Sequence, residues 1–317
     1  MTPSDDGVNF EKAFEYTGPT SFPPNPAAFI MYRTLDFKNL SFFNLNKRKV
    51  DNTIFGITDD WYGSCYITKL NSDGTFVTTK LGNRGWWTKD IISFKHQLYA
   101  GFYNDASLYF TMRTAKEPIS ASHWQDVSAP AFGKDPSTGK YYANMTAESS
   151  AVFKGYLYIG TYNKGYFGRT TQGAQIWRTA NGTTWEPCML NGFGSIKKTS
   201  ISHMAVFGGY LYATTSEAFG QNYIYRTKDG INWELVYSGM SSEPYIGDII
   251  SYMGRLYLTT YNWGGRVYSS LDGKTWIAVS AKYINSNTQN SLIGDLQIYK
   301  GYLYVNTRNM TSGTNIF

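Results

Sequence analysis

A short element recurs along the chain, and this internal repeat constrains the fold more than any other feature of the sequence. The clearest copies read FKGYLYIGTY at residues 153–162, FGGYLYATT at 207–215 and MGRLYLTTY at 253–261. Each copy consists of two β-rich runs joined by a tight turn of glycine or polar residues, which is the pattern of a β-hairpin. Such a repeat predicts one supersecondary unit that is used many times.

Three weaker copies, at 50–58, 94–103 and 299–307, bring the number of predicted hairpins to six. The copies align on one apolar anchor position, occupied by Ile54, Leu98, Leu157, Leu211, Leu256 and Leu303. Successive anchors are 44, 59, 54, 45 and 47 residues apart. These are the lengths of propeller blades, so the spacing predicts a ring of four-stranded sheets.

A second element follows the hairpins, best seen as YRTKDGINW at 225–233 and YSSLDGKTW at 268–276. The same element at 177–185 has Asn181 in place of aspartate. Its aspartate suits a turn in which a side chain accepts backbone N–H bonds, and its glycine suits a positive φ. Its tryptophan can pack between neighbouring sheets. We therefore predict a structural role for these residues and for the arginines before each turn, Arg113, Arg178 and Arg226.

This element resembles the Asp-box, or BNR repeat, Ser/Thr-x-Asp-x-Gly-x-x-Trp, of sialidases, sortilin and other β-propellers. The resemblance covers nearly the whole chain and implies an all-β fold, a six-bladed β-propeller with four-stranded antiparallel blades. The sialidase catalytic motif Phe/Tyr-Arg-Ile-Pro is missing, because the nearest stretch, FIMYRT at 29–34, lacks its Arg-Ile-Pro core. The resemblance therefore implies the fold of this superfamily without sialic-acid cleavage.

The two ends of the chain are predicted to complete one blade together. No box follows Leu303, whereas SDDGVNF at 4–10 matches the box at 227–233, with Phe10 in the tryptophan position. We expect the N-terminal strand to close the last blade, which makes residues 1–317 a single domain. The interval before Ile54 also contains a Pro-rich stretch, which predicts a surface insertion at about residues 18–40.

Charge and the absence of motifs narrow the classes of partner. The net charge of +6 and the sequence pI of about 9.0 favour an anionic partner such as an acidic polysaccharide. Without a nucleic-acid-binding signature or a long apolar stretch, we expect neither nucleic acid binding nor membrane insertion. The first residues do not have the pattern of a signal peptide, so an extracellular or virion-surface location, which we favour, requires another export route.

Polar residues stand eight positions before the six anchors and form the first candidate site. They are Asn46, Asp90, Ser149, His203, Asp248 and Asp295, with Glu148 beside Ser149. The first strand of each blade lines the central channel, so equal offsets predict a ring at one channel mouth. In one interpretation these residues are solvated and cap loop amides. In the other, Asp90, Asp248 and Asp295 bind a cation; no cofactor is expected otherwise, and oxygen ligands suit Ca²⁺.

Aromatic residues in the predicted loops form the second candidate site. Aromatic residues make up 17% of the chain, and the loop positions are Trp61, Tyr62, Trp86, Trp87, Tyr141, Tyr142, Tyr166 and Trp263. These rings either pack between blades or form a polar-aromatic surface on which sugars stack.

The leading hypothesis is a non-enzymatic binding, adhesion or structural module. It would recognise glycans, or bind other proteins of an extracellular, cell-surface or virion assembly. The alternative is a glycan-active hydrolase or lyase that uses the acidic ring at the central channel, with or without Ca²⁺. The sequence has no recognisable nucleotide-binding, zinc-binding or serine-hydrolase motif that would favour an enzyme.

Overall fold

The computed structural model shows an all-β protein built from antiparallel sheets. The description covers residues 14–15, 41–47, 54–59, 65–70, 76–82, 86–104, 108–116, 120–163, 171–217, 221–238, 245–260, 264–284, 286–299, 301–309 and 313–317. The chain divides into two compact units, one made of residues 39–204 and the other of residues 1–38 and 205–317. Within the described ranges no helix is long and apolar enough to cross a membrane.

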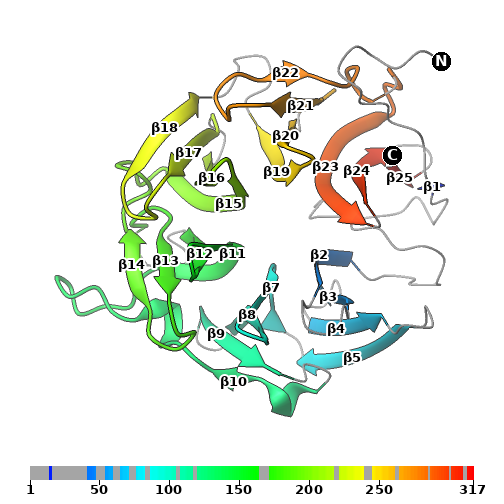
Figure 1. The fold of residues 1–317 in the computed structure, drawn as a ribbon. Helices are drawn as coiled ribbons and strands as arrows, with labels where there is room; N and C mark the ends of the chain where they lie inside the picture. The colour runs from blue at the N-terminus through cyan, green and yellow to red at the C-terminus, as the bar shows by residue number, and fades with distance from the viewer. Residues whose placement is uncertain are drawn as a thin grey trace. The chain divides into compact units, whose positions relative to one another are not determined.

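The unit of residues 39–204 contains three groups of paired strands, in which most strands pair with the next one along the chain (Figure 1). The first group is β2 (Ser41–Lys47), β3 (Ile54–Asp59), β4 (Cys65–Leu70) and β5 (Phe76–Gly82). The second is β6 (Trp86–Trp87), β7 (Ile91–Phe94), β8 (Gln97–Asn104), β9 (Tyr109–Ala115) and β10 (Gln125–Asp126). The third is β11 (Asn144–Phe153), β12 (Tyr156–Asn163), β13 (Ile176–Thr179) and β14 (Glu186–Met189). Two single-turn 3₁₀ helices, Ala121–His123 and Pro130–Phe132, lie in the connections around β10.

The strand β15 (Lys198–Phe207) carries the chain from this unit into the other. There the strand groups are β16 (Tyr210–Glu217), β17 (Tyr223–Thr227) and β18 (Trp233–Ser238), followed by β19 (Ile246–Tyr252), β20 (Arg255–Thr260), β21 (Val267–Ser270) and β22 (Ile277–Ala278). The last group is β23 (Asn290–Tyr299), β24 (Tyr302–Asn309), β25 (Gly313–Ile316) and β1 (Phe14–Glu15).

The N-terminal segment is the outermost strand of this last sheet. β1 pairs antiparallel with β25, with Phe14 opposite Ile316, and β24 carries the anchor Leu303. The predicted pairing of the chain ends is therefore confirmed at residues 14 and 15. The box-like segment at 4–10 and the Pro-rich stretch at 18–40 lie outside the described residues.

The hairpin turns explain why the repeat folds as it does. Lys154 and Gly155 have φ of 48° and 81°, and Met253 and Gly254 have φ of 44° and 77°. Two consecutive positive φ angles are the mark of a type I′ turn, whose twist matches that of the two strands it joins. The anchors Leu98, Leu157, Leu211 and Leu256 are fully buried, so in these four hairpins the repeat places one side chain in the core.

The box residues form the turns β13–β14, β17–β18 and β21–β22, and the three turns share one hydrogen-bond pattern. Asp272 Oδ1 accepts the amides of Lys274 and Thr275 at 2.8 and 2.7 Å, and the Ser270 hydroxyl accepts the Gly273 amide at 2.8 Å. Asp229 and Asn181 accept the corresponding two amides at 2.8 and 2.9 Å. The predicted chemistry of the turn is confirmed, including the positive φ of its glycine.

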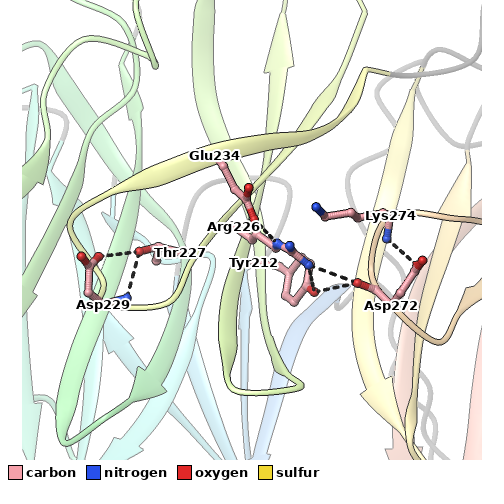
Figure 2. Close-up of polar contacts among 7 residues, drawn as sticks. All are labelled: Tyr212, Arg226, Thr227, Asp229, Glu234, Asp272 and Lys274. Atoms are coloured by element: carbon pink, nitrogen blue, oxygen red, sulfur yellow. Dashed lines mark hydrogen bonds and ion pairs between the residues drawn. The ribbon is translucent and has the colours of Figure 1, made fainter.

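One of these turns packs against a tyrosine of the preceding strand group (Figure 2). The Tyr212 hydroxyl on β16 donates to the Asp272 carbonyl at 3.4 Å, and Arg226 Nη1 donates to the same carbonyl at 3.2 Å. Arg226 Nε also pairs with Glu234 across β17–β18 at 2.5 Å. Arg178 pairs with Glu186, and Arg113 with Asp126, in the same cross-strand manner. The three arginines therefore have the structural role that was predicted for them.

The glycine of the turn is required by this packing. A Cβ added to Gly273 would lie 2.2 Å from the Tyr212 hydroxyl oxygen, and one added to Gly182 would lie 2.0 Å from that of Tyr99. Box tryptophans complete the contact: Trp185 Nε1 donates to the Val127 carbonyl at 2.8 Å, and the Trp276 ring lies edge-on to Tyr237. The same turn thus joins successive strand groups in both units.

Replacing Gly273 by alanine should destabilise the protein by about 2–4 kcal/mol, because left-handed strain adds to the clash with Tyr212. Gly254→Ala is the matched control, since this glycine has a similar φ of 77° but open space around it; strain alone should cost about 1–2 kcal/mol. Urea unfolding measures both free energies. Adding Tyr212→Phe to Gly273→Ala should recover part of the loss, whereas equal losses in the two glycine variants would contradict the packing.

Acid stability should depend on the charge of Asp272. The amides of Thr275 and Lys274 hold the pKa of this carboxyl well below its ordinary value. A depressed folded-state pKa contributes stability that is present above the unfolded-state pKa of about 4 and is lost as the pH falls below it. Asp272→Asn should therefore flatten the fall of the melting temperature between about pH 5 and pH 2.

The reciprocal change is available in the same chain. Asn181 already makes the box contacts with an uncharged side chain, and its Nδ2 donates to Thr184 as an asparagine at 272 would to Thr275. Asn181→Asp should steepen the acid dependence. A pH profile that neither variant alters would show that these turns do not couple folding to protonation.

Candidate functional site

Three of the predicted site residues of the unit 39–204, Asp90, Glu148 and Ser149, lie at the beginning of β7 and on β11. Asp90 is buried immediately before β7, and the Ser150 hydroxyl donates to its Oδ2. Lys89 Nζ lies 3.2 Å from Glu148 Oε2, and the Thr146 hydroxyl donates to the other oxygen of Glu148. The structure therefore brings Asp90, Glu148 and Ser149 into one region, each with a protein partner.

Ser149 connects β11 to β15, the first strand of the following group. Its hydroxyl donates to the Ile201 carbonyl on β15 at 2.6 Å. Gly160 on β12, the partner of Ser149, has no side chain, so β12 can lie close to β15. A Cβ added to Gly160 would lie 2.6 Å from Ile201. His203 lies further along β15 and is half-buried.

In the other unit, Asp248 makes the same kind of connection. Its Oδ1 accepts the amide of Ile249 at 2.6 Å, and its Oδ2 accepts the amide of Leu296 on β23 at 2.8 Å. Asp295, the neighbour of Leu296, is half-buried on β23. Thr259, paired with Asp248, donates to the Gly294 carbonyl on the same strand at 2.8 Å.

These contacts share one arrangement. In each case a side chain forms a hydrogen bond with the first strand of the following group. These side chains are Asp90 just before β7, Ser149 on β11 and Asp248 on β19. At these positions the carboxylates and hydroxyls satisfy groups of the protein itself. A ring that joins all six positions stays a prediction. Among the described residues no group of three His, Cys, Asp or Glu side chains is placed to hold a metal ion.

Asn46 departs from the predicted alignment. Ser149 and Asp248 pair with residues three positions after their anchors, Gly160 and Thr259. In the first group that position is Ile57, and its partner is Asn44, whereas Asn46 pairs with Phe55. Six residues, 48–53, join β2 to β3, whereas the clearest hairpins have two-residue turns. Counting back eight residues from Ile54 therefore reaches Asn46, two positions short of the equivalent site at Asn44.

Half of the predicted aromatic site lies outside the described residues, which include none of Trp61, Tyr62, Tyr166 and Trp263. Trp86 and Trp87 form the short strand β6, which pairs with β8. Tyr141 and Tyr142 are described and face different environments: the Tyr142 side chain is 7% exposed in the core, and Tyr141 is 37% exposed. Tyr141 is therefore the one position of this set that the structure shows at the surface.

Sequence reasoning missed a buried polar network behind Tyr141. Asn144 Oδ1 accepts from the Thr161 hydroxyl at 2.9 Å and from Asn163 Nδ2 at 3.0 Å, and Asn144 Nδ2 donates to Gln175 Oε1 at 2.6 Å. All four side chains are fully buried. A signal was present, because Asn144 and Asn290 stand thirteen residues before their anchors and both donate to a loop carbonyl.

Neither cysteine offers a reactive thiolate. Cys65 is fully buried, and burial raises the pKa of the Cys188 thiol to about 12. A thiol needs a lowered pKa to act as a nucleophile near neutral pH.

Comparisons with known proteins identify the fold but no family. No family model and no curated protein matches the sequence. The chain is similar to a prolyl endopeptidase structure, with a TM-score of 0.52 and 10% identity over 88% of this chain and 42% of that one. It is also similar to Trypanosoma rangeli sialidase (TM-score 0.46, 16% identity, 75% and 45% coverage) and to an α-L-arabinofuranosidase from Clostridium thermocellum (0.45, 10%, 76% and 93%).

The chain spans less than half the length of the endopeptidase and of the sialidase. At these identities the similarity concerns the fold alone. Together with the antiparallel strand groups, the match to the prolyl endopeptidase shows that this chain has a β-propeller-like, all-β fold.

Proposed function

We propose that this protein is a non-enzymatic binding module that recognises glycans on a rigid propeller scaffold. One observation carries the proposal: polar side chains predicted to face the channel hold neighbouring strands together. Asp90 accepts from Ser150, Ser149 donates to Ile201, and Asp248 accepts the amides of Ile249 and Leu296. Groups fixed in this way suit a scaffold, and recognition then falls to the loops.

The scaffold that we propose is a six-bladed propeller whose last blade includes the N-terminal strand. Six sequence repeats and the pairing of β1 with β25 support it. The recurrence of one contact in both units supports it further, since Tyr99 meets the turn at Gly182 as Tyr212 meets that at Gly273. Box turns of the Asp-box type would then occupy equivalent places around the ring.

The proposed partners are glycans, or glycan-bearing and other proteins of an extracellular, cell-surface or virion assembly. The net charge of +6 and the exposed, lysine-flanked Tyr141 support an anionic partner with apolar ring faces.

The alternative, a hydrolase or lyase at the acidic ring, is favoured by one observation. A buried Asp90 lies one residue from Lys89, which pairs with Glu148, so two carboxylates and a cation occupy one region. Ca²⁺ bound by Asp90, Asp248 and Asp295 would have to compete with the two amides that Asp248 already accepts.

Asp248→Asn separates the two functions. If Asp248 is structural, the variant should lose about 1–3 kcal/mol of unfolding free energy, because an amide cannot accept at both ends. Its binding on a glycan array should match that of the wild type. Asp126→Asn is the control, since its exposed pair with Arg113 should contribute about 1 kcal/mol or less.

The enzyme would be supported by glycan turnover, or by bound Ca²⁺ that Asp248→Asn abolishes without loss of stability. Metal analysis and product analysis of the same samples report these results. A wild-type protein that binds no glycan on the array would contradict the binding module.

A further inference from the structure

The loop between the 3₁₀ helix Pro130–Phe132 and β11 forms a closed, ordered tip. Lys134 and Tyr141 form an antiparallel bridge, and the Asp135 amide donates to the Lys140 carbonyl at 2.9 Å. Inside the tip, the Gly139 amide donates to the Asp135 carbonyl at 2.8 Å, and the amide and hydroxyl of Ser137 donate to Asp135 Oδ1 at 2.8 and 2.6 Å. The tip therefore holds its own shape.

Hydrogen bonds also connect the tip to the buried network. Gln172 Nε2 donates to Asp135 Oδ2 at 3.0 Å, and Gln172 Oε1 accepts the Ala143 amide at 3.2 Å. The backbone N–H of Gln172 in turn donates to Asn163 Oδ1 at 3.0 Å, and Asn163 is fully buried beside Asn144. A surface fixed in advance loses little conformational freedom when a ligand binds.

Two tyrosine rings lie together at the base of this tip. The Tyr141 ring packs against Tyr109 with centroids 5.0 Å apart at 51°, and 37% of Tyr141 is exposed, whereas Tyr142 beside it is buried. Tyrosine offers a rigid, amphipathic surface at a low cost in side-chain entropy. The apolar face of a sugar ring fits against such a surface, and sugar hydroxyls can reach the polar groups around it.

The charge beside these rings is positive. Lys134 Nζ lies 5.2 Å from the centre of the Tyr141 ring, and Lys140 is exposed on the same tip. The one carboxylate of the tip, Asp135, is engaged by Ser137 and Gln172, and these hydrogen bonds hold its pKa below the ordinary value. An anionic group next to the rings would meet two ammonium groups.

We propose that Tyr141, Tyr109, Lys134 and Lys140 form a binding subsite for a polysaccharide whose sugars carry carboxylate groups. The inference rests on the proposed glycan-binding function and gives it a place and a ligand class. One sugar ring lies against Tyr141, and its carboxylate accepts hydrogen bonds from Lys134 or Lys140. The lysine that now lies beside the ring turns toward the carboxylate, which is a stronger partner than the aromatic face.

Affinity electrophoresis of the full chain tests the subsite. The gels contain polygalacturonate, alginate or hyaluronate, and matched gels contain the neutral polymers dextran or xylan. The wild type should be retarded by at least one acidic polymer more than by either neutral one. Tyr141→Ala should weaken that binding about tenfold, because it removes the stacking surface.

Two control variants use similar residues elsewhere. Tyr302→Ala removes a 67% exposed tyrosine from the other unit and should leave the affinity unchanged. Lys134→Gln with Lys140→Gln should weaken acidic binding about tenfold, whereas Lys154→Gln, which removes a lysine beside the Phe153 ring, should not. The lysine variants keep the test decisive if Tyr141→Ala fails to fold.

Each remaining result has one meaning. Acidic-polymer binding that survives both the Tyr141 and the lysine changes would overturn the subsite and leave glycan recognition standing. Retardation by neutral polymers alone would overturn the proposed ligand class. No binding to any polymer overturns the subsite, and it contradicts the proposed function as well if the glycan array is also negative.

Discussion

The architecture depends on a turn whose buried glycine packs against a tyrosine of the preceding strand group. Gly273 and Gly182 are buried, and neither leaves room for a Cβ beside Tyr212 or Tyr99. The buried glycine amide needs an acceptor, and the Ser or Thr hydroxyl of the turn supplies it, while the Asp or Asn side chain accepts the two exposed amides that follow. Burial raises the pKa of Tyr212, and its hydroxyl donates to the Asp272 carbonyl of the turn.

A second kind of contact connects the first strands of successive groups. Gly160 lets β12 approach Ile201 closely, and Ser149 and Asp248 each connect their strand to the backbone of the next. At these positions the polar side chains therefore connect strands. The Tyr141 tip differs, because its polar groups hold a loop in shape while its rings and lysines face solvent. This contrast places the search for recognition in the loops.

The sequence predicted those features that depend on neighbouring residues. The I′ turns, the amide-accepting Asp229 and Asp272, and the positive φ of the box glycines follow from local chemistry that repeats. It also predicted the pairing of the N-terminal strand, because the missing box matched the other end of the chain.

The candidate site was harder to predict because its partners are distant in sequence. Asp90 and Ser150 are sixty residues apart, and nothing local to either indicates the other. Ser149 and Asp248 keep the rule that equal offsets lie at equal depth, whereas the longer connection after Asn46 breaks it. Likewise, which of the neighbours Tyr141 and Tyr142 is exposed depends on the conformation of their loop, which local sequence does not indicate.

Hydrogen exchange on the full chain and on a chain without residues 1–17 tests the proposed closed ring most directly. If the N-terminal strand closes the ring, its removal should lower amide protection in β24 and in strands of both units, with several kcal/mol lost globally. If protection falls only at residues 313–317 and the melting temperature stays unchanged, the strand merely covers one edge and the ring account is contradicted.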